Sequence, residues 1–390
     1  MKVPFFIPYW KKEELATVQA ESGKDSDAVE RLECEFPQAM QREGTAIAVG
    51  SGRTALLLAL RVLKQQLPDR NEVVIPSYTC RGVLEPIIRC GLTPVFADIG
   101  EDLNITFSRV SPLVNEKTLA VIVVHTGGKY VADASRLTKL AQQYGAAVID
   151  DFCQAPGIHQ QTGGTGSVSP IAIFSFGLGK CLTATAGGML LARDPGESFA
   201  KERANLREGN PSHADQRLAY IRKTFTRNAE RLSFYPPKLP TCIFASAYGY
   251  EHMQALDAVL IRHQLERRKE MFERRQEIAA RRIESMRSLP GIEIPQAAGP
   301  SVWSQFTLLA ETPEWKKRLR AGLFKAGIQT EEAYPPLHLC DFGESYTTPS
   351  LPNCEKVSRR AFHLPIYPGL TDEEIEWITS SMRKIVAGSS

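Results

Sequence analysis

An alternation of short apolar segments with segments of helical periodicity, between about residues 45 and 192, constrains this chain more than any other feature. The apolar segments are rich in β-branched residues and are predicted to be strands. They begin at Thr45, Glu72, Thr93, Leu119, Ala146, Ile171 and Gly187. Helices are predicted between the earlier strands, over residues 54–67, 80–90 and 133–145. Apolar strands separated by helices indicate an α/β fold whose mainly parallel sheet is sandwiched by helices, with ligands at the carboxyl ends of its strands.

The rest of the chain has a different character. Residues 194–247 are polar and rich in arginine, and we expect an irregular excursion or a domain crossing there. A long helical pattern follows from Gly249 to Met286, and its charged residues are expected to form a solvated face. Three later segments predict a compact α+β unit: VWSQFTLLA, EWKKRLRAGLFKAG and TDEEIEWITSSMRKIV. We therefore expect a large domain over residues 1–245, and a connecting helix with a smaller C-terminal domain over residues 246–390.

Composition excludes several classes of protein. The 390 residues are 43% hydrophobic and 23% charged, which excludes a mostly disordered or fibrous chain. A net charge of +3 gives no global attraction to nucleic acid or membrane, and neither is an expected partner. The 8 cysteines form no CxxC pair, which argues against a disulfide framework or a zinc ribbon. Because no signal peptide or membrane span is recognisable, the expected location is the cytoplasm.

Two motifs in the first half of the chain could bind a ligand. GSGRTALLLAL, from Gly50 to Leu60, places a glycine turn before a helix, where free N–H groups and the helix dipole favour a phosphate. It could equally be a tight strand-to-helix connection. In AVIDDFCQAPG a strand ends with Asp150 and Asp151, whose side chains are expected on opposite faces, so that one carboxylate enters a given site or caps the next turn. A metal site is not indicated, because His159 has no spaced His or Cys partners.

Two further motifs contain candidate functional residues. IAIFSFGLGK places Ser175 and Lys180 just after an apolar strand, where the lysine could be an amine nucleophile toward a carbonyl or a plain surface residue. AYPPLHLCDFG, from Ala333 to Gly343, is a proline-stiffened loop whose His338 could be structural or catalytic. Taken together, a phosphate cradle, a carboxylate and a lysine at the strand ends of one sheet are the set that a pyridoxal 5′-phosphate (PLP) site needs.

From about residue 45 to the C-terminus the sequence resembles the DegT/DnrJ/EryC1/StrS sugar aminotransferases, which have the fold type I architecture. Seven segments in the same order carry the resemblance: SGRTALLLAL, NEVVIPSYTCRGVLEPIIRCGLTPVFADI, AVIVVHTGGKYVAD, YGAAVIDDFCQAPG, SPIAIFSFGLGKCLTATAGGMLL, AGIQTEEAYPPLHL and LPNCEKVSRRAFHLPIYPGLT. The resemblance implies a PLP enzyme that takes nitrogen from glutamate or glutamine. The acceptor would be a keto sugar, usually nucleotide-linked, in polysaccharide or secondary-metabolite biosynthesis. It also implies a homodimer with its sites at the subunit interface.

The resemblance also assigns roles to residues of this chain. Lys180 matches the lysine that binds PLP covalently, and Asp151 matches the partner of the pyridine nitrogen. The other cofactor contacts would be Ser175, Thr54 and Ala55 at the phosphate and Gln154 beside the ring hydroxyl. Arg53 could add a phosphate or substrate contact, and Tyr334 and His338 are expected to contact the substrate.

Some positions depart from the family pattern. Cys80 stands where an aromatic residue usually stacks on the cofactor ring, and Cys181 replaces a common asparagine. The segment AYGYEHM replaces one whose asparagine ordinarily reaches the partner subunit's phosphate. A PLP-dependent sugar dehydratase and a non-catalytic PLP-fold subunit or regulator therefore remain alternatives. Lys180 favours amino transfer, because dehydratases of 4-keto sugars often have histidine there. A dinucleotide-binding oxidoreductase is disfavoured by the lack of GxGxxG.

Overall fold

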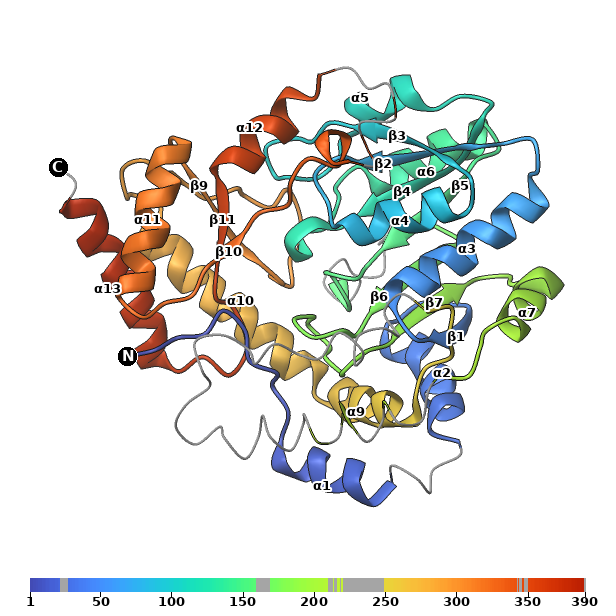
Figure 1. Cartoon of the computed structure of the whole chain (residues 1–390), viewed down its shortest axis with the longest axis horizontal. Coiled ribbons are helices and arrows are strands. Elements are labelled where there is room, and N and C mark those ends of the chain that lie inside the picture. The colour runs from blue at the N-terminus through green and yellow to red at the C-terminus, as the bar shows by residue number, and fades with distance from the viewer. Residues whose placement is uncertain are drawn as a thin grey trace.

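A seven-stranded sheet organises the larger part of the molecule (Figure 1). In the computed structural model its strand order is β1-β7-β6-β5-β4-β2-β3. The strands are β1 (Thr45–Val49), β2 (Glu72–Pro76), β3 (Thr93–Ala97), β4 (Thr118–Val124), β5 (Ala147–Asp151), β6 (Ile171–Ser175) and β7 (Gly188–Ala192). β7 runs antiparallel to both of its neighbours, β1 and β6, and the other neighbouring strands in this sheet are parallel. Each strand begins at its predicted residue or one residue away, and the mainly parallel α/β architecture is confirmed.

The structure describes most of the chain in five stretches, residues 1–21, 27–158, 169–209, 249–341 and 350–388. It also describes the single residues 213, 216, 217, 219, 343 and 346. His159 and nearly all of the expected excursion after residue 209 lie outside the described residues. In the part of the chain that is described, no helix combines the length and the apolar character needed to cross a membrane.

Helices pack on both faces of the large sheet. They are α2 (Ala28–Ala39), α3 (Gly52–Gln66), α4 (Arg81–Arg89), α5 (Phe107–Val110), α6 (Ala134–Gln143) and α7 (Gly196–Ala204). Two short 3₁₀ turns, Ser111–Leu113 and Thr126–Gly128, complete the connections, and α1 (Lys12–Glu21) precedes them all. Along β4, Val121 and Val123 join one apolar core while Ile122 and Val124 join the other. Both faces of the strand are therefore buried, which explains why the strand sequences are apolar throughout.

A smaller antiparallel sheet of order β10-β11-β9-β8 lies beside the first, on the left in Figure 1. Its strands are β8 (Ile292–Glu293), β9 (Phe306–Ala310), β10 (Glu331–Glu332) and β11 (Ala361–Leu364). Around it lie the 3₁₀ turn Leu337–Leu339 and the helices α11 (Pro313–Lys325), α12 (Pro352–Arg360) and α13 (Asp372–Ala387). Val3 pairs with Ile328 and is buried in the core of this unit. The proposed boundary near residue 245 falls outside the described residues, so the division into domains stays a prediction.

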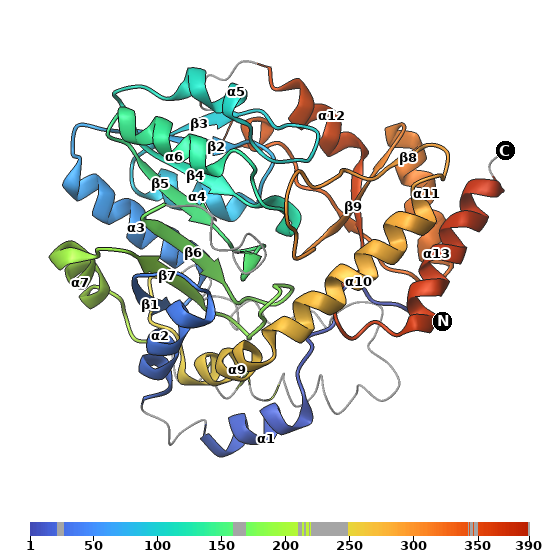
Figure 2. The same ribbon diagram turned by 180° about the vertical axis from the view of Figure 1, so that it is seen from behind.

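The predicted long helix from Gly249 to Met286 is two helices, α9 (Ala255–Glu266) and α10 (Arg268–Met286). They break at Arg267, whose backbone leaves the helical conformation and whose guanidinium binds residues near the N-terminus. Figure 2 shows α10 running from the large sheet to the small one. Its charges are not all solvated as expected, because Arg275 and Arg282 are buried and donate hydrogen bonds to carbonyl groups of residues 365 and 366.

Candidate active site

A cavity of about 280 Å³ opens at the carboxyl ends of the central strands. It brings together the end of β5, the end of β6, the loop after β6 and the first turn of α3. Five of the residues singled out from the sequence line this cavity: Arg53, Asp151, Gln154, Ser175 and Lys180. The loop after β2 adds Thr79 and Cys80. The topology therefore gathers motifs that are more than 120 residues apart in the sequence.

The N-terminus of α3 forms one wall of the cavity. Ser51 caps the helix, with its Oγ accepting the Thr54 N–H at 3.1 Å. The first turn approaches β6 so closely that a Cβ added to Gly52 would lie 2.8 Å from the Ser175 Cβ. This close approach aims the positive end of the helix dipole and the Ser175 side chain at the same space, as an anion site requires.

Thr54 and Ala55 lie in this first turn but do not line the cavity. The Thr54 N–H donates to Ser51 Oγ and the Ala55 N–H donates to the Ser51 carbonyl at 3.0 Å, so both N–H groups are engaged within the helix start. Arg53 does line the cavity, and its guanidinium pairs with Glu85 of α4 at 3.4 Å. The proposed roles of Thr54, Ala55 and Arg53 at a phosphate stay predictions.

The adjacent carboxylates at the end of β5 lie in different environments. Asp151 lines the cavity and is 4% exposed, and its Oδ1 accepts the Cys153 N–H at 2.9 Å. Asp150 does not line the cavity, since it is hydrogen-bonded to Ser169 and lies 3.4 Å from His125 Nε2. The alternation of side chains along the strand thus presents one carboxylate to the cavity and buries the other behind the sheet.

Gln154 links the cavity to the small sheet. Its Oε1 accepts the Gly127 N–H at 2.8 Å, and its Nε2 donates to the Tyr334 hydroxyl oxygen at 3.2 Å. Gln305 donates to the same oxygen at 3.0 Å. Burial raises the pKa of the Tyr334 phenol above its ordinary value. Tyr334 therefore stands directly behind a cavity-lining side chain, although it comes from the C-terminal unit.

Lys180 lies on a turn that follows β6. Its N–H donates to the Gly177 carbonyl at 3.1 Å, and Gly179 takes a φ of +90° that favours glycine. The side chain is half-buried and lines the cavity. The turn thus directs a primary amine into the space that also contains Asp151 and Ser175.

His338 does not share this site. It is buried, with its Nδ1 2.7 Å from Ser77 Oγ and its Nε2 3.5 Å from a Glu355 oxygen. The Ser77 contact ties the loop after β10 to the loop after β2, and the Glu355 contact ties it to α12. The expected contact of His338 with the substrate stays a prediction.

Cys153 is a cavity residue that the sequence analysis overlooked. A Cβ added to Gly52 would lie 3.1 Å from the Cys153 Sγ, so the thiol lies against the first turn of α3. Burial, followed by the neighbouring Asp151 carboxylate, raises the pKa of the Cys153 thiol well above its usual range. The sequence signal that could have indicated Cys153 as a cavity residue is its position two residues after Asp151.

The residues present fit PLP. The cradle between Gly52 and Ser175 suits a phosphate, the lysine supplies an amine for a carbonyl, and Asp151 supplies an acceptor for a protonated ring nitrogen. Among the described residues there is no group of three or more His, Cys, Asp or Glu side chains that could hold a metal ion. The donor set is thus that of an anionic organic cofactor.

Comparisons with known proteins show what the chain is similar to. A model of the DegT/DnrJ/EryC1/StrS aminotransferase family matches residues 11–383. The chain is 29% identical over 402 aligned residues to the spore coat polysaccharide biosynthesis protein SpsC of Bacillus subtilis, covering 99% of this chain and 98% of that protein. It is 27% identical to DesV of S. venezuelae, solved in complex with a ketimine intermediate, with a TM-score of 0.77 and coverage of 99% and 98%.

A third similarity shows the fold alone. The E. coli GDP-4-keto-6-deoxy-D-mannose-3-dehydratase with bound hydrated PLP is 18% identical, with a TM-score of 0.79. The alignment covers 98% of this chain and 99% of that one. Aminotransferases and a dehydratase therefore share this architecture, so the reaction must be argued from the site.

Proposed function

This chain belongs to the DegT/DnrJ/EryC1/StrS aminotransferase family, and we propose that it is a PLP-dependent aminotransferase acting on a keto sugar. The amino donor is glutamate or glutamine, and the acceptor is a nucleotide-linked sugar used in polysaccharide or secondary-metabolite biosynthesis. The observation that carries the proposal is that Lys180 and Asp151 line one cavity beside the N-terminus of α3. The name of the Bacillus relative supports polysaccharide biosynthesis as the setting.

Each residue has a definite task in this reaction. When bound, PLP supplies the electron sink that makes loss of a substrate Cα proton feasible. The Lys180 amine is placed to remove that proton and to return one, as general base and then general acid. The Asp151 carboxylate, oriented by the Cys153 N–H, holds a proton on the ring nitrogen.

The remaining residues hold the cofactor in place. The first turn of α3 and the Ser175 hydroxyl would bind the phosphate, and the Gln154 amide, which also lines the cavity, would hold the ring hydroxyl. Gln154 is fixed from both ends by Gly127 and Tyr334, so its amide has one preferred orientation. Such fixed contacts keep the ring oriented while substrates exchange. The family resemblance supports a homodimer as the working form.

The half-reaction with the amino donor tests the proposal. Purified protein loaded with PLP is mixed with glutamate or glutamine, and we expect the visible absorption of the bound cofactor to disappear. A Lys180→Ala variant is the control and should not show this change. If neither donor changes the spectrum of the loaded protein, transamination from them is wrong. A dehydratase or a non-catalytic subunit then becomes the better assignment.

A further inference from the structure

The loop between β6 and β7, residues 176–187, contains Lys180 and is anchored to α9. We call it the lysine loop. Gln264 of α9 binds both backbone groups of Thr183: its Oε1 accepts the Thr183 N–H at 2.8 Å, and its Nε2 donates to the Thr183 carbonyl at 2.7 Å. Gln264 is 1% exposed, so these two bonds form away from water. A buried amide that satisfies both groups of one residue fixes the loop at that residue.

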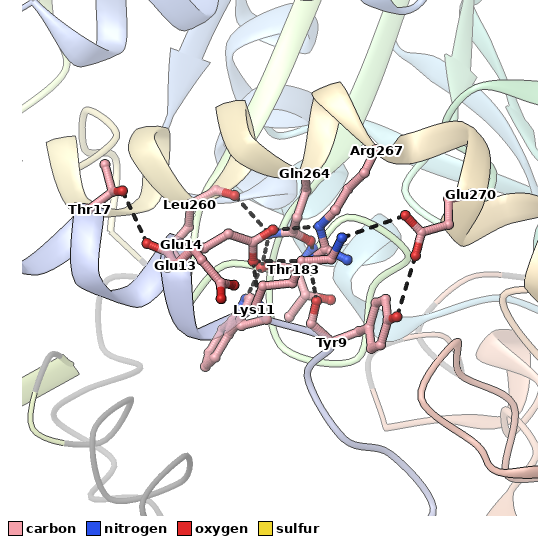
Figure 3. Close-up of polar contacts among 11 residues, drawn as sticks. Tyr9, Lys11, Glu13, Glu14, Thr17, Thr183, Leu260, Gln264, Arg267 and Glu270 are labelled. Atoms are coloured by element: carbon pink, nitrogen blue, oxygen red, sulfur yellow. Dashed lines mark hydrogen bonds and ion pairs between the residues drawn. The ribbon is translucent and has the colours of Figure 1, made fainter.

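A second anchor comes from the N-terminal segment. Trp10 donates its indole Nε1–H to the same Thr183 carbonyl at 2.7 Å. This segment is held by Arg267, at the break between α9 and α10, which pairs with Glu14 at 2.5 Å and lies over the Tyr9 ring. Figure 3 shows Arg267, Glu14 and Gln264 side by side above Thr183. The break in the helix thus places Arg267 beside the N-terminal segment, where its contacts fix the part of the chain that contains Trp10.

A third anchor lies two turns earlier on α9. The Oδ1 atom of Asp257 accepts the Thr185 N–H at 3.0 Å, the Thr185 hydroxyl at 2.6 Å and the Ala186 N–H at 3.1 Å. Its Oδ2 pairs with Arg217 at 3.0 Å. Because Asp257 and Gln264 are seven residues apart, they project from the same face of α9. One helix face therefore holds the lysine loop at three residues.

These anchors connect directly to Lys180. The Thr183 hydroxyl donates to the Lys180 carbonyl, so the residue that Gln264 and Trp10 fix is itself bonded to the lysine backbone. We propose that Gln264, Trp10 and Asp257 are positioning residues that hold the Lys180 amine in its reactive place. The proposal deepens the proposed function and rests on it. It predicts that loosening the anchors slows chemistry at Lys180 more than it weakens substrate binding.

Hydrogen exchange of the protein without added PLP tests the anchoring itself. In Gln264→Leu we expect exchange of the amides of residues 183–187 to become about tenfold faster, because one buried pair of hydrogen bonds is lost. Gln276→Leu is the matched control: Gln276 on α10 also donates to a backbone carbonyl, that of Ser301, but away from the loop. Unchanged exchange in the lysine loop of Gln264→Leu would overturn the proposal.

The reaction at Lys180 provides the second readout. With PLP-loaded enzyme we expect Gln264→Leu to lower kcat about tenfold while the KM for the amino donor stays within about twofold. The rate at which PLP forms a borohydride-fixable adduct on Lys180 should fall in parallel. Trp10→Phe keeps an aromatic ring at this position but has no N–H donor, so it should fold and show a smaller loss of the same kind.

The two proposals fail in different ways. If the wild type forms no adduct on Lys180, the proposed function is wrong. If the wild type forms the adduct and both variants match its rate and its kcat, Gln264 and Trp10 do not position the lysine. An equal loss in Gln276→Leu would also contradict the inference, because it would show a general effect of stability.

Discussion

At the scale of single residues, the account depends on which of two neighbouring carboxylates enters the cavity. Asp151 lines it and receives the Cys153 N–H, whereas Asp150 is committed to Ser169 and lies beside His125. A carboxylate in a buried, preorganised place stabilises a positive charge better than one in water. We therefore assign the proposed electrostatic role at the cofactor to Asp151 rather than to Asp150.

Asp151→Asn tests this assignment. The amide has the same shape and can still accept the Cys153 N–H, so we expect the variant to fold. Without the negative charge, turnover should fall by about 10²–10³-fold. Steady-state kinetics with saturating PLP measures the effect, and turnover within about threefold of wild type would remove Asp151 from its role.

Cys153 provides a residue-scale prediction that does not depend on turnover. Since burial and Asp151 raise its thiol pKa, little thiolate is present near neutral pH, and the thiolate is the reactive form. We expect iodoacetamide at pH 8 to label the exposed Cys34 well before Cys153 in the native protein. Peptide mass spectrometry over time measures both rates. Equal labelling of the two cysteines would show that the cavity is more open than described.

At the scale of elements, the start of α3 must lie against β6. A Cβ on Gly52 would come within 2.8 Å of Ser175 Cβ, closer than such atoms approach in proteins, so an added methyl group must push the helix away from the strand. The gap between the helix dipole and Ser175 would then widen at the place assigned to the phosphate.

Gly52→Ala should therefore weaken PLP binding by about tenfold or more, as judged by titration of the cofactor absorbance. Gly299→Ala is a suitable control, because its added Cβ would meet no atom closer than 3.6 Å and its backbone is not left-handed. Comparable PLP affinity in both variants would contradict the cradle described for α3.

The elements also show what sequence reasoning can reach. Strands buried on both faces are apolar throughout, so all seven were predictable. The motifs that contain Asp151 and Lys180 could be placed after two of these strands, but the choice of these two residues came from the family resemblance. The break at Arg267 was not predictable, because it coincides with contacts to residues more than 250 positions away. Gln264 was overlooked for a similar reason, since a glutamine within a helix has no local signature. The position of His338 depends on which loops meet, which periodicity does not encode.

At the scale of the whole molecule, the large and small sheets are joined through buried polar contacts. Lys129 is 1% exposed, and its ammonium donates to the Asp102 carbonyl at 3.3 Å and to the Pro295 carbonyl at 2.9 Å. Pro295 lies just after β8 of the small sheet. The lysine thus links the two units through hydrogen bonds to main-chain carbonyl groups.

This arrangement predicts a pH dependence of stability. Burial lowers the pKa of Lys129 from about 10.5 to about 8. Between these two pKa values the unfolded chain holds a proton that the folded protein releases. Titration of Lys129 therefore makes the free energy of unfolding rise as pH increases from about 8 to about 10.5. Each pKa unit corresponds to about 1.4 kcal/mol, so the whole shift corresponds to about 3–4 kcal/mol. Since each state is only half-titrated at its own pKa, about 2–3 kcal/mol of this is gained between the two values.

Urea unfolding at pH 7.5 and pH 10, compared with Lys129→Met, measures this contribution. We expect the free energy of unfolding of the wild type to increase relative to that of the variant as pH increases, so that the difference between the two grows. A difference that stays constant or shrinks would mean that Lys129 remains charged in the folded protein.

The most direct test of the central claim is to locate the cofactor on the chain. Protein supplemented with PLP is reduced with borohydride, digested and mapped by mass spectrometry. We predict a pyridoxyl group on Lys180 and its loss in Lys180→Ala. Protein that stays colourless and free of vitamin B6, or a pyridoxyl group on another lysine, would contradict the account.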